Sequence, residues 1–343
     1  MPHGSAHSRL PRMQVVQFDR FGDPAEVLQV VDAPDPGPPA AGEAAVDFVA
    51  SPINPSDLLT VRGEYGVRPE LPATPGYEGV GRVAALGVGV AHLKPGDLVL
   101  LAGGRGAWRA RANLPAARLF ALPPADPLQL AMLAANPPTA LLMLEQFVAL
   151  APGDWVIQNA ANSGVGVALA AIARARGLHT VNVVRRAGLE EQLTAAGGDV
   201  VLVDGPDLPR RVRAALADAG ATPDALRLGI DAVGGHATGR LARSVAEGGT
   251  VVNYGAMSGE PCAVEPRDTI FRDVTLRGFW LSRWFAAAPG EEIRRVFATV
   301  AGYVADGTVR VPVEATYPLA HAREAAAHAG RGERGGKVLL TAE

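Results

Sequence analysis

The stretch of sequence that most constrains the fold runs from Trp155 to Arg186. It reads as an apolar strand, a glycine-containing loop, a helix of small residues and a second apolar strand. Gly164 and Gly166 lie where the first strand must turn sharply into the helix. Without side chains there, backbone N–H groups can approach a phosphate at the helix N-terminus, where the helix dipole favours anions. The pattern predicts a dinucleotide site, and an ordinary tight turn between strand and helix is the alternative.

Two arginines, Arg185 and Arg186, follow the second strand of this stretch. In dinucleotide-binding folds an acid at this position binds the ribose 2′-hydroxyl of NAD, whereas arginine accommodates the 2′-phosphate of NADP. The nearest acid, Glu190, falls on the next predicted helix. A hydrogen bond to a charged group contributes roughly 1.5–3 kcal/mol, so the pair predicts NADPH rather than NADH. Two solvated surface arginines are the alternative.

Length and composition indicate a globular protein of about two domains. The chain has 343 residues, of which 48% are hydrophobic and 20% are charged, and one core rarely serves so long a chain. The net charge of −3 gives no reason to expect nucleic acid as a partner. No apolar run reaches the roughly 18 residues of a membrane span, and a single cysteine fits a reducing compartment. We therefore expect a soluble, cytoplasmic protein.

The order of predicted elements differs between the two parts of the chain. Residues 1–12 lack an apolar segment, and we expect them to form a disordered extension. From residue 13 to about 122, short strands separated by Gly and Pro predict a compact antiparallel β domain, and we expect a barrel. A helical segment broken at Asn136-Pro137-Pro138 marks the expected domain hinge. Beyond it, strands alternate with helices, which predicts a doubly wound parallel sheet.

Metal ligands are scarce in this sequence. One cysteine and seven scattered histidines cannot supply a four-cysteine zinc site, and the histidines show no ligand spacing. We therefore expect no metal ion and no zinc in the chemistry.

Tyr65 is the candidate acid. It lies between Glu64 and Gly66, in a segment typical of a loop. A tyrosine hydroxyl is protonated at neutral pH, so it can give a proton to an enolate as the enolate forms. The alternative is a loop tyrosine that only packs its ring.

The aromatic segment from Phe279 to Trp284 allows three interpretations: a pocket for an apolar tail, an interface or part of the core.

Several motifs together resemble one family of enzymes. They are Asn54-Pro-Ser-Asp, Gly63-Glu-Tyr-Gly, Val156-Ile-Gln-Asn-Ala-Ala-Asn-Ser-Gly-Val-Gly and Arg277-Gly-Phe-Trp-Leu-Ser. The chain resembles the zinc-independent medium-chain dehydrogenases/reductases and is most similar to the mitochondrial-type trans-2-enoyl-thioester reductases. It departs from the family pattern at Glu64, where the family usually has Asn. At Tyr77 zinc enzymes carry histidine, and this part of the chain is closer to the general zinc-free form.

The resemblance implies an α/β protein of two domains that assembles as a homodimer. A GroES-like β-barrel catalytic domain is expected over residues 13–133, completed by residues 278–343. A doubly wound parallel (Rossmann) nucleotide-binding domain is expected over residues 134–277, and the dimer is expected to form through this domain.

The resemblance also implies site residues. Tyr65 corresponds to the catalytic tyrosine of the family. We expect Asn54, Trp280 and Trp284 to line the substrate pocket. The expected contacts with NADPH are Asn136, Asn162, Ser163, Gly164, Val165, Gly166, Arg185, Arg186, Tyr254, Gly255, Ala256, Met257, Phe279, Trp280, Leu281, Ser282 and Lys337.

These features predict NADPH-dependent reduction of the C=C bond of a trans-2-enoyl thioester, carried by coenzyme A or by acyl carrier protein. Hydride passes to the β-carbon, and the α-carbon takes a proton. A quinone or enone reductase, which uses the same hydride transfer without a thioester, is the alternative. A non-catalytic NADPH-binding protein is a third possibility from a different class.

Overall fold

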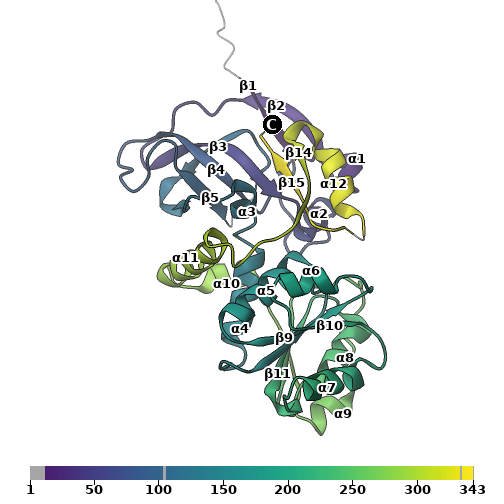
Figure 1. Cartoon of the computed structure of the whole chain (residues 1–343). Coiled ribbons are helices and arrows are strands. Elements are labelled where there is room, and N and C mark those ends of the chain that lie inside the picture. Colours follow the sequence, from purple (N-terminus) through teal and green to yellow (C-terminus); the bar gives the residue numbers. More distant parts are fainter. Residues whose placement is uncertain (1–11, 103–105, 333, 343) are drawn as a thin grey trace, which may run out of the picture. The chain divides into compact units, whose positions relative to one another are not determined.

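The computed structural model describes residues 12–102, 106–332 and 334–342, and the chain forms two compact units (Figure 1). The first unit consists of Met1–Ala134 and Pro312–Glu343, and the second of Ala135–Val311. The extension expected over residues 1–12 lies outside the described residues except for Arg12, which begins the first strand. The second unit is therefore inserted into the sequence of the first.

The first unit is built on a seven-stranded sheet and a separate two-stranded ribbon. Its strands are β1 (Arg12–Gln17), β2 (Gln29–Pro34), β3 (Glu43–Pro52), β4 (Glu78–Leu86), β5 (Leu98–Ala102), β6 (Arg111–Pro115), β7 (Phe120–Ala121), β14 (Val313–Pro318) and β15 (Lys337–Thr341). Its helices are α1 (Pro24–Val27), α2 (Pro55–Arg62), α3 (Pro127–Ala131) and α12 (Ala322–Gly330), with 3-10 turns η1 (Ala116–Arg118) and η3 (Leu319–His321). The large sheet runs β14–β15–β3–β4–β5–β7, and β6 also pairs with β3. Because β15 pairs with β3, the C-terminal segment completes the N-terminal sheet, as the resemblance implied.

Helix α12 shows how the C-terminal segment is fixed to this unit. Ala322, Ala325, Ala326 and Ala329 are all buried and follow the spacing of one helix face. They pack into the same core as Phe18 and other apolar residues of the N-terminal strands. Small side chains on that face let the helix backbone approach the core closely.

The second unit contains one six-stranded sheet in which every pair of strands is parallel. Its strands are β8 (Trp155–Gln158), β9 (His179–Val184), β10 (Val200–Val203), β11 (Leu226–Asp231), β12 (Thr250–Asn253) and β13 (Thr275–Gly278). Its helices are α4 (Asn136–Gln146), α5 (Gly164–Ala175), α6 (Glu190–Ala195), α7 (Leu208–Asp218), α8 (Gly235–Ser244), α9 (Pro266–Ile270), α10 (Leu281–Ala287) and α11 (Gly290–Ala305), with the 3-10 turn η2 (Pro223–Ala225). The strand order is β10–β9–β8–β11–β12–β13. From β8 the chain adds β9 and β10 on one side and then β11, β12 and β13 on the other, which is the doubly wound arrangement that the sequence predicted.

Helix α5 depends on small residues where it begins. A Cβ added at Gly166 would lie 2.4 Å from the carbonyl oxygen of Ala161, so any larger residue would push the helix away from the loop. Residues 167–173 of the helix are buried without exception. The glycine in the fingerprint therefore serves close packing between the loop and the helix.

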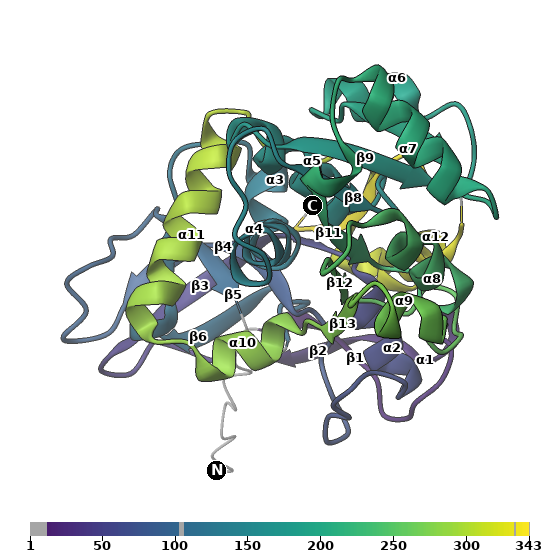
Figure 2. The same cartoon turned by 90° about the horizontal axis from the view of Figure 1, so that it is seen from below.

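The chain returns to the first unit later than we expected. Residues 278–311 belong to the second unit, whereas the resemblance implied that they complete the barrel domain. Helix α11 accounts for the difference, because it lies beside α4 (Figure 2). The Arg295 guanidinium reaches the Glu145 carboxylate of α4 at 2.8 Å. The sequence predicted the amphipathic helix itself but did not reveal its packing partner.

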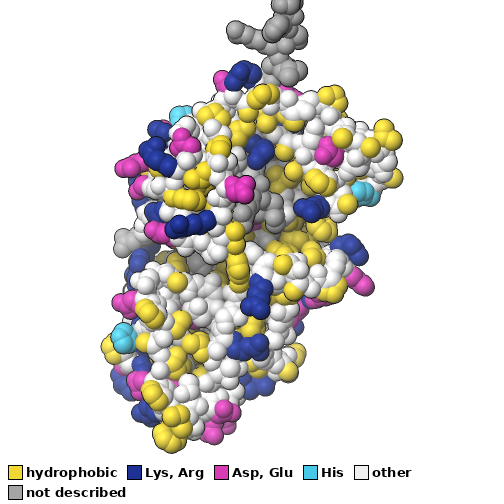
Figure 3. All heavy atoms as spheres, turned by 180° about the vertical axis from the view of Figure 1, so that it is seen from behind, with side chains coloured by type: hydrophobic (Ala, Val, Ile, Leu, Met, Phe, Trp, Pro, Cys, Tyr) yellow, Lys and Arg dark blue, Asp and Glu magenta, His cyan; other side chains and the backbone are white. Residues whose placement is uncertain are grey.

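Over residues 12–102, 106–332 and 334–342, no helix has both the length and the apolar character needed to cross a bilayer. On the face in Figure 3, acidic, basic and hydrophobic side chains are interspersed.

Candidate active site

The expected site residues divide between the two units. Tyr65, Asn54 and Lys337 belong to the first unit, and all the others belong to the second. The second unit contributes the nucleotide loop, and the first contributes the candidate proton donor.

The nucleotide loop joins the end of β8 to the start of α5. Ser163 is the N-cap of α5, and its hydroxyl accepts a hydrogen bond from the backbone N–H of Gly166 at 3.1 Å. The hydroxyl of Tyr254, which follows β12, forms a hydrogen bond with the Ser163 side chain, and burial raises the pKa of Tyr254. Two segments far apart in the sequence therefore meet at the carboxyl end of the sheet, where dinucleotides bind in this fold.

A buried polar frame supports this loop. Asn159 at the end of β8 donates to the Asp231 carboxylate at 2.6 Å, and Asn253 at the end of β12 donates to the same carboxylate at 3.0 Å. Thr238 of α8 donates a third hydrogen bond at 2.6 Å. Asp231 is fully buried, and the three donors compensate for the lost solvation of its charge. This frame was not predicted from the sequence, although the sequence has a polar residue at the end of each of these central strands.

A second hydrogen-bonded pair holds the start of α5 against β9. The Gln158 side-chain amide donates to the carbonyl oxygen of Gly166 at 2.9 Å and to Asn182 Oδ1 at 2.7 Å. Gln158 and Asn182 are both buried. These bonds fix the backbone that carries the glycine loop.

The arginine pair lies at the end of β9, where the fingerprint predicts it. Arg185 and Arg186 are both exposed, as is Glu190 at the start of α6. Exposed guanidinium groups at this edge of the sheet fit a 2′-phosphate, because Arg forms bidentate, charge-assisted hydrogen bonds with phosphate.

Asn136 provides an independent test of whether the residues fit a cofactor. It is the first residue of α4 and is only 8% exposed. Its Nδ2 is buried and has no hydrogen-bond partner among the described residues. A buried donor without a partner is unusual in a native structure and fits an acceptor on a bound ligand. With the glycine loop and the arginine pair, the described residues fit a dinucleotide.

The loop after β12 and the aromatic segment supply the remaining expected contacts. Gly255 is half-buried, whereas Ala256 and Met257 are exposed. The backbone N–H of Phe279 donates to the carbonyl oxygen of Asn253 at 2.9 Å, which places the aromatic segment beside the end of β12. Leu281 is half-buried and Ser282 is exposed on α10.

The aromatic segment combines a packed part and an exposed part. The Phe279 ring meets Phe147 edge to face at 6.0 Å, and Trp284 packs against Phe285 at 5.3 Å between ring centres. Phe285 in turn stacks on Phe297 of α11 at 5.5 Å. Trp280, the N-cap residue of α10, is 42% exposed. Trp284 thus belongs partly to the core of this unit, while much of the Trp280 ring is accessible.

Tyr65 lies on a loop that follows α2, as expected. Asn54 and Asp57 form a capping box at the start of the helix, and Gly63 ends it with a left-handed φ of 76°. The Tyr65 side chain is half-buried, and its ring centre lies 5.5 Å from that of Tyr77. The phenol is therefore held against another aromatic ring on a short loop.

A buried polar cluster lies behind this loop. The Asn54 amide donates to Glu78 at 2.7 Å and accepts a hydrogen bond from the Lys337 amine. Burial lowers the pKa of Lys337 to about 8 and raises the pKa of Asp57 to about 6. Both polar atoms of Asn54 are engaged inside the protein, and Lys337 is 8% exposed. The roles expected for Asn54 in the substrate pocket and for Lys337 at NADPH remain predictions.

Comparisons with known proteins define the class of protein. Residues 40–124 match the family "Alcohol dehydrogenase GroES-like domain", and residues 210–340 match "Zinc-binding dehydrogenase". Among the described residues, no group of three or more His, Cys, Asp and Glu is arranged to hold a metal ion. The fold and these matches define a medium-chain dehydrogenase/reductase with a GroES-like domain and a Rossmann-type domain.

Curated relatives identify the family within this class of dehydrogenases/reductases. The mitochondrial enoyl-[acyl-carrier-protein] reductase of Mus musculus is 39% identical over 321 residues, which are 92% of this chain and 85% of the relative. The enzyme of the same name from Arabidopsis thaliana is 37% identical over 89% of this chain and 81% of its own length. The chain belongs to this family of enoyl reductases, which confirms the resemblance seen in the motifs. The cytoplasmic location expected from the sequence is wrong on this comparison, because these relatives are named as mitochondrial.

Solved structures agree on the fold. A complex of Etr1p with NADP and crotonyl-CoA has a TM-score of 0.86 and 25% identity, and covers 97% of this chain and all of that one. A putative NADPH:quinone reductase from Bacillus thuringiensis also has a TM-score of 0.86, with 29% identity over 97% of this chain and all of that one. Both an enoyl-thioester and a quinone enzyme therefore share this architecture.

The buried cluster around Asn54 yields a prediction about stability. Lys337→Met removes the positive charge next to buried Glu78 and the donor to Asn54, so the free energy of unfolding should fall by about 3–5 kcal/mol. The double variant Lys337→Met/Glu78→Gln removes both charges and keeps an acceptor for the Asn54 amide, so it should recover most of that loss. Urea denaturation of the wild type and both variants measures the difference. Equal losses in the single and double variants would show that the Lys337 charge does not stabilise Glu78.

Proposed function

We propose that this protein reduces the C=C bond of a trans-2-enoyl thioester. Its family membership makes it an NADP-dependent oxidoreductase that acts on CH–CH bonds. The observation that carries the proposal is the match to enoyl reductases along nearly the whole chain, 39% identical over 92% of it. A half-buried tyrosine on the loop after α2 supports it.

The second unit binds and orients the cofactor. The backbone at the N-terminus of α5 binds the pyrophosphate, where the helix dipole favours negative charge. Arg185 and Arg186 bind the 2′-phosphate, and the Asn136 amide donates to an acceptor on the cofactor. NADPH supplies the hydride for the substrate β-carbon.

The first unit supplies the proton donor, Tyr65. As the β-carbon gains hydride, the electron pair of the C=C bond moves toward the thioester oxygen and forms an enolate. The Tyr65 hydroxyl then gives its proton to the α-carbon, and the enolate electron pair forms the new C–H bond. Bulk water returns a proton to the phenolate.

A quinone reductase is the second candidate, because a solved structure of that name is similar along 97% of this chain. A quinone takes up hydride and becomes a hydroquinone through protonation on oxygen, so it needs no donor at a carbon. Tyr65 would then have no required step, which makes this residue the point at which the two functions differ.

Tyr65→Phe is the variant that tests the proposal. It should lower kcat for crotonyl-CoA by about 10²–10⁴-fold, the usual contribution of a positioned general acid. The dissociation constant for NADPH should stay unchanged, since Tyr65 is not among the residues proposed to contact the cofactor. Steady-state oxidation of NADPH and fluorescence titration measure the two quantities. Undiminished turnover would remove Tyr65 from the mechanism.

The arginine pair predicts the cofactor preference. Arg185→Ala/Arg186→Ala removes two charge-assisted contacts with the 2′-phosphate, so the ratio of kcat/KM for NADPH to that for NADH should fall about 100-fold or more. The value for NADH should stay the same, because NADH lacks the phosphate. Arg213→Ala, which removes an exposed arginine from α7, is the matched control. A wild type that uses both cofactors equally would contradict the assignment.

We also infer that the second unit forms a homodimer through β13. This strand is at the end of the sheet, and all four of its residues are exposed. Leu276 on the strand is 40% exposed, and the neighbouring Ile270 and Phe271 are 68% and 78% exposed. An edge strand beside exposed apolar side chains favours pairing with another strand. A similar solved structure from Candida tropicalis is named as the Etr1p/Etr2p heterodimer of a 2-enoyl thioester reductase.

Leu276→Lys tests the dimer. A charge on the edge strand should oppose pairing, so light scattering should give the mass of two chains for the wild type and of one chain for the variant. Val88→Lys is the control, because Val88 is 83% exposed in the first unit. A monomeric wild type, or an equal effect of both variants, would contradict the interface.

A further inference from the structure

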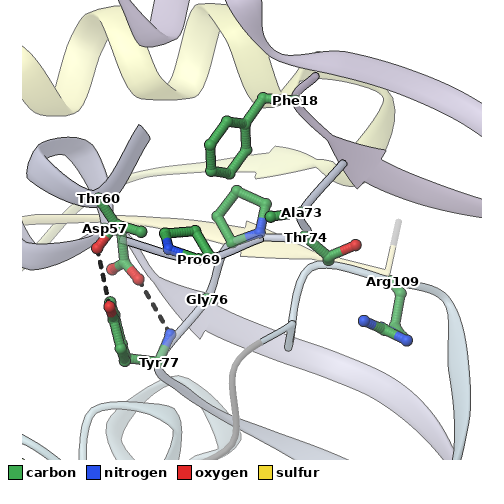
Figure 4. A pocket seen from close by; sticks show the side chains of 10 residues that line it. Phe18, Asp57, Thr60, Pro69, Ala73, Thr74, Gly76, Tyr77 and Arg109 are labelled. Atoms are coloured by element: carbon green, nitrogen blue, oxygen red, sulfur yellow. Dashed lines mark hydrogen bonds between the residues drawn. The ribbon is translucent and has the colours of Figure 1, made fainter. Parts of the chain in front are cut away.

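Tyr77 contacts Tyr65 and is held by hydrogen bonds from two directions. The two rings are tilted by 57° with their centres 5.5 Å apart, an ordinary aromatic contact. The Tyr77 hydroxyl lies 2.9 Å from Thr60 Oγ1, and its backbone N–H donates to Asp57 Oδ1 at 3.0 Å (Figure 4). Thr60 and Asp57 both belong to α2, the helix that leads into the Tyr65 loop. One helix therefore fixes Tyr77 and also positions the start of the loop that carries Tyr65.

The direction of the hydroxyl hydrogen bond follows from counting protons. Thr60 Oγ1 donates to the carbonyl oxygen of Ser56 at 2.8 Å. A hydroxyl has a single proton to donate, so Tyr77 must be the donor in its contact with Thr60. This assignment directs the Tyr77 proton to Thr60. Its contribution is to hold the neighbouring ring.

The hydrogen bonds matter because Tyr77 is not packed on every side. Tyr77 also lines a cavity of about 130 Å³, together with Phe18, Pro69 and Ala73 (Figure 4). Apolar contacts are missing wherever a side chain borders an empty space. The bond to Thr60 thus keeps the ring against Tyr65 instead of letting it move toward the cavity.

Asp57 anchors the other end of this arrangement. Its carboxylate is fully buried and accepts the backbone N–H of Asn54 at 2.8 Å as well as that of Tyr77. Asn54 is in turn tied to Glu78, the residue after Tyr77, through its side-chain amide. The backbone around Tyr77 is therefore fixed by buried bonds on both sides.

We propose that Tyr77 is a positioning residue for Tyr65, which it holds at the place where the substrate α-carbon must be protonated. The inference rests on the proposed function, since it assumes that Tyr65 is the proton donor. Small displacements of a reacting group lower rates steeply. Tyr77 acts through the position of Tyr65 and takes no part in binding NADPH.

Three variants distinguish the contribution of the Tyr77 ring from that of its hydroxyl. Tyr77→Phe and Thr60→Val each break the same hydrogen bond, so each should lower kcat for crotonyl-CoA by about 2- to 10-fold. Tyr77→Ala also removes the ring contact and should lower kcat by about 100-fold. The dissociation constant for NADPH should not change in any of them. Tyr317→Phe is the matched control, because it removes a tyrosine hydroxyl that bonds His328 in the same unit.

A double-mutant cycle tests whether Tyr77 acts through Tyr65. In the Tyr65→Phe background, Tyr77→Phe should cause no further loss of kcat, because the proton donor is already absent. An equal loss in both backgrounds would overturn the proposal, as would wild-type kcat in both Tyr77→Phe and Thr60→Val. Full turnover of Tyr65→Phe alone would instead refute the proton donor of the proposed function, and with it this inference.

Fluorine NMR provides a readout that does not depend on turnover. The chain has five tyrosines, and the fluorotyrosine signal missing from Tyr65→Phe identifies Tyr65. Thr60→Val should shift or broaden that signal, although Thr60 is not in the Tyr65 loop. An unchanged Tyr65 signal in both Thr60→Val and Tyr77→Phe would overturn the positioning role.

Discussion

A buried hydrogen bond between Lys337 and Asn54 joins the two ends of the first unit. Asn54 caps α2, ahead of the Tyr65 loop, and Lys337 begins β15, the strand that completes the N-terminal sheet. Because the second unit is inserted between these two segments, the sheet of the first unit is completed only where β15 pairs with β3. The same bond links the loop that carries the candidate acid to the core of the sheet. Burial of the amine, which lowers the pKa of Lys337 to about 8, is the energetic cost of this link.

In the second unit too, buried hydrogen bonds join segments that are distant in the sequence, and they lie at the carboxyl end of its sheet. Asn159, Asp231 and Asn253 close the ends of three adjacent strands with buried hydrogen bonds. Gln158 and Asn182 extend this polar layer to β9. A loop that must present backbone N–H groups to a phosphate requires a rigid support, and fully satisfied polar networks are rigid. In each unit, therefore, the candidate site residues are supported by buried polar groups that do not themselves act on the substrate.

The sequence predicted the local elements well, because their patterns are local. The glycine loop, α5 and the strands around it follow from periodicity and from the turn at Gly164 and Gly166. The return point of the chain could not be predicted in this way, since it depends on α11 packing against α4. The contact of Tyr77 with Tyr65 and the bond of Lys337 with Asn54 also join segments that no sequence period relates. The motifs identified Tyr65 but not the residues that hold it.

The reduction of crotonyl-CoA by NADPH in deuterated water tests the central claim most directly. Hydride from the cofactor carries ordinary hydrogen to the β-carbon, whereas an exchangeable acid such as the Tyr65 hydroxyl delivers deuterium to the α-carbon. Mass spectrometry and NMR of the product locate the label. The proposed function predicts butyryl-CoA with one deuterium, at the α-carbon. Oxidation of NADPH by a quinone with no reduction of crotonyl-CoA would contradict it.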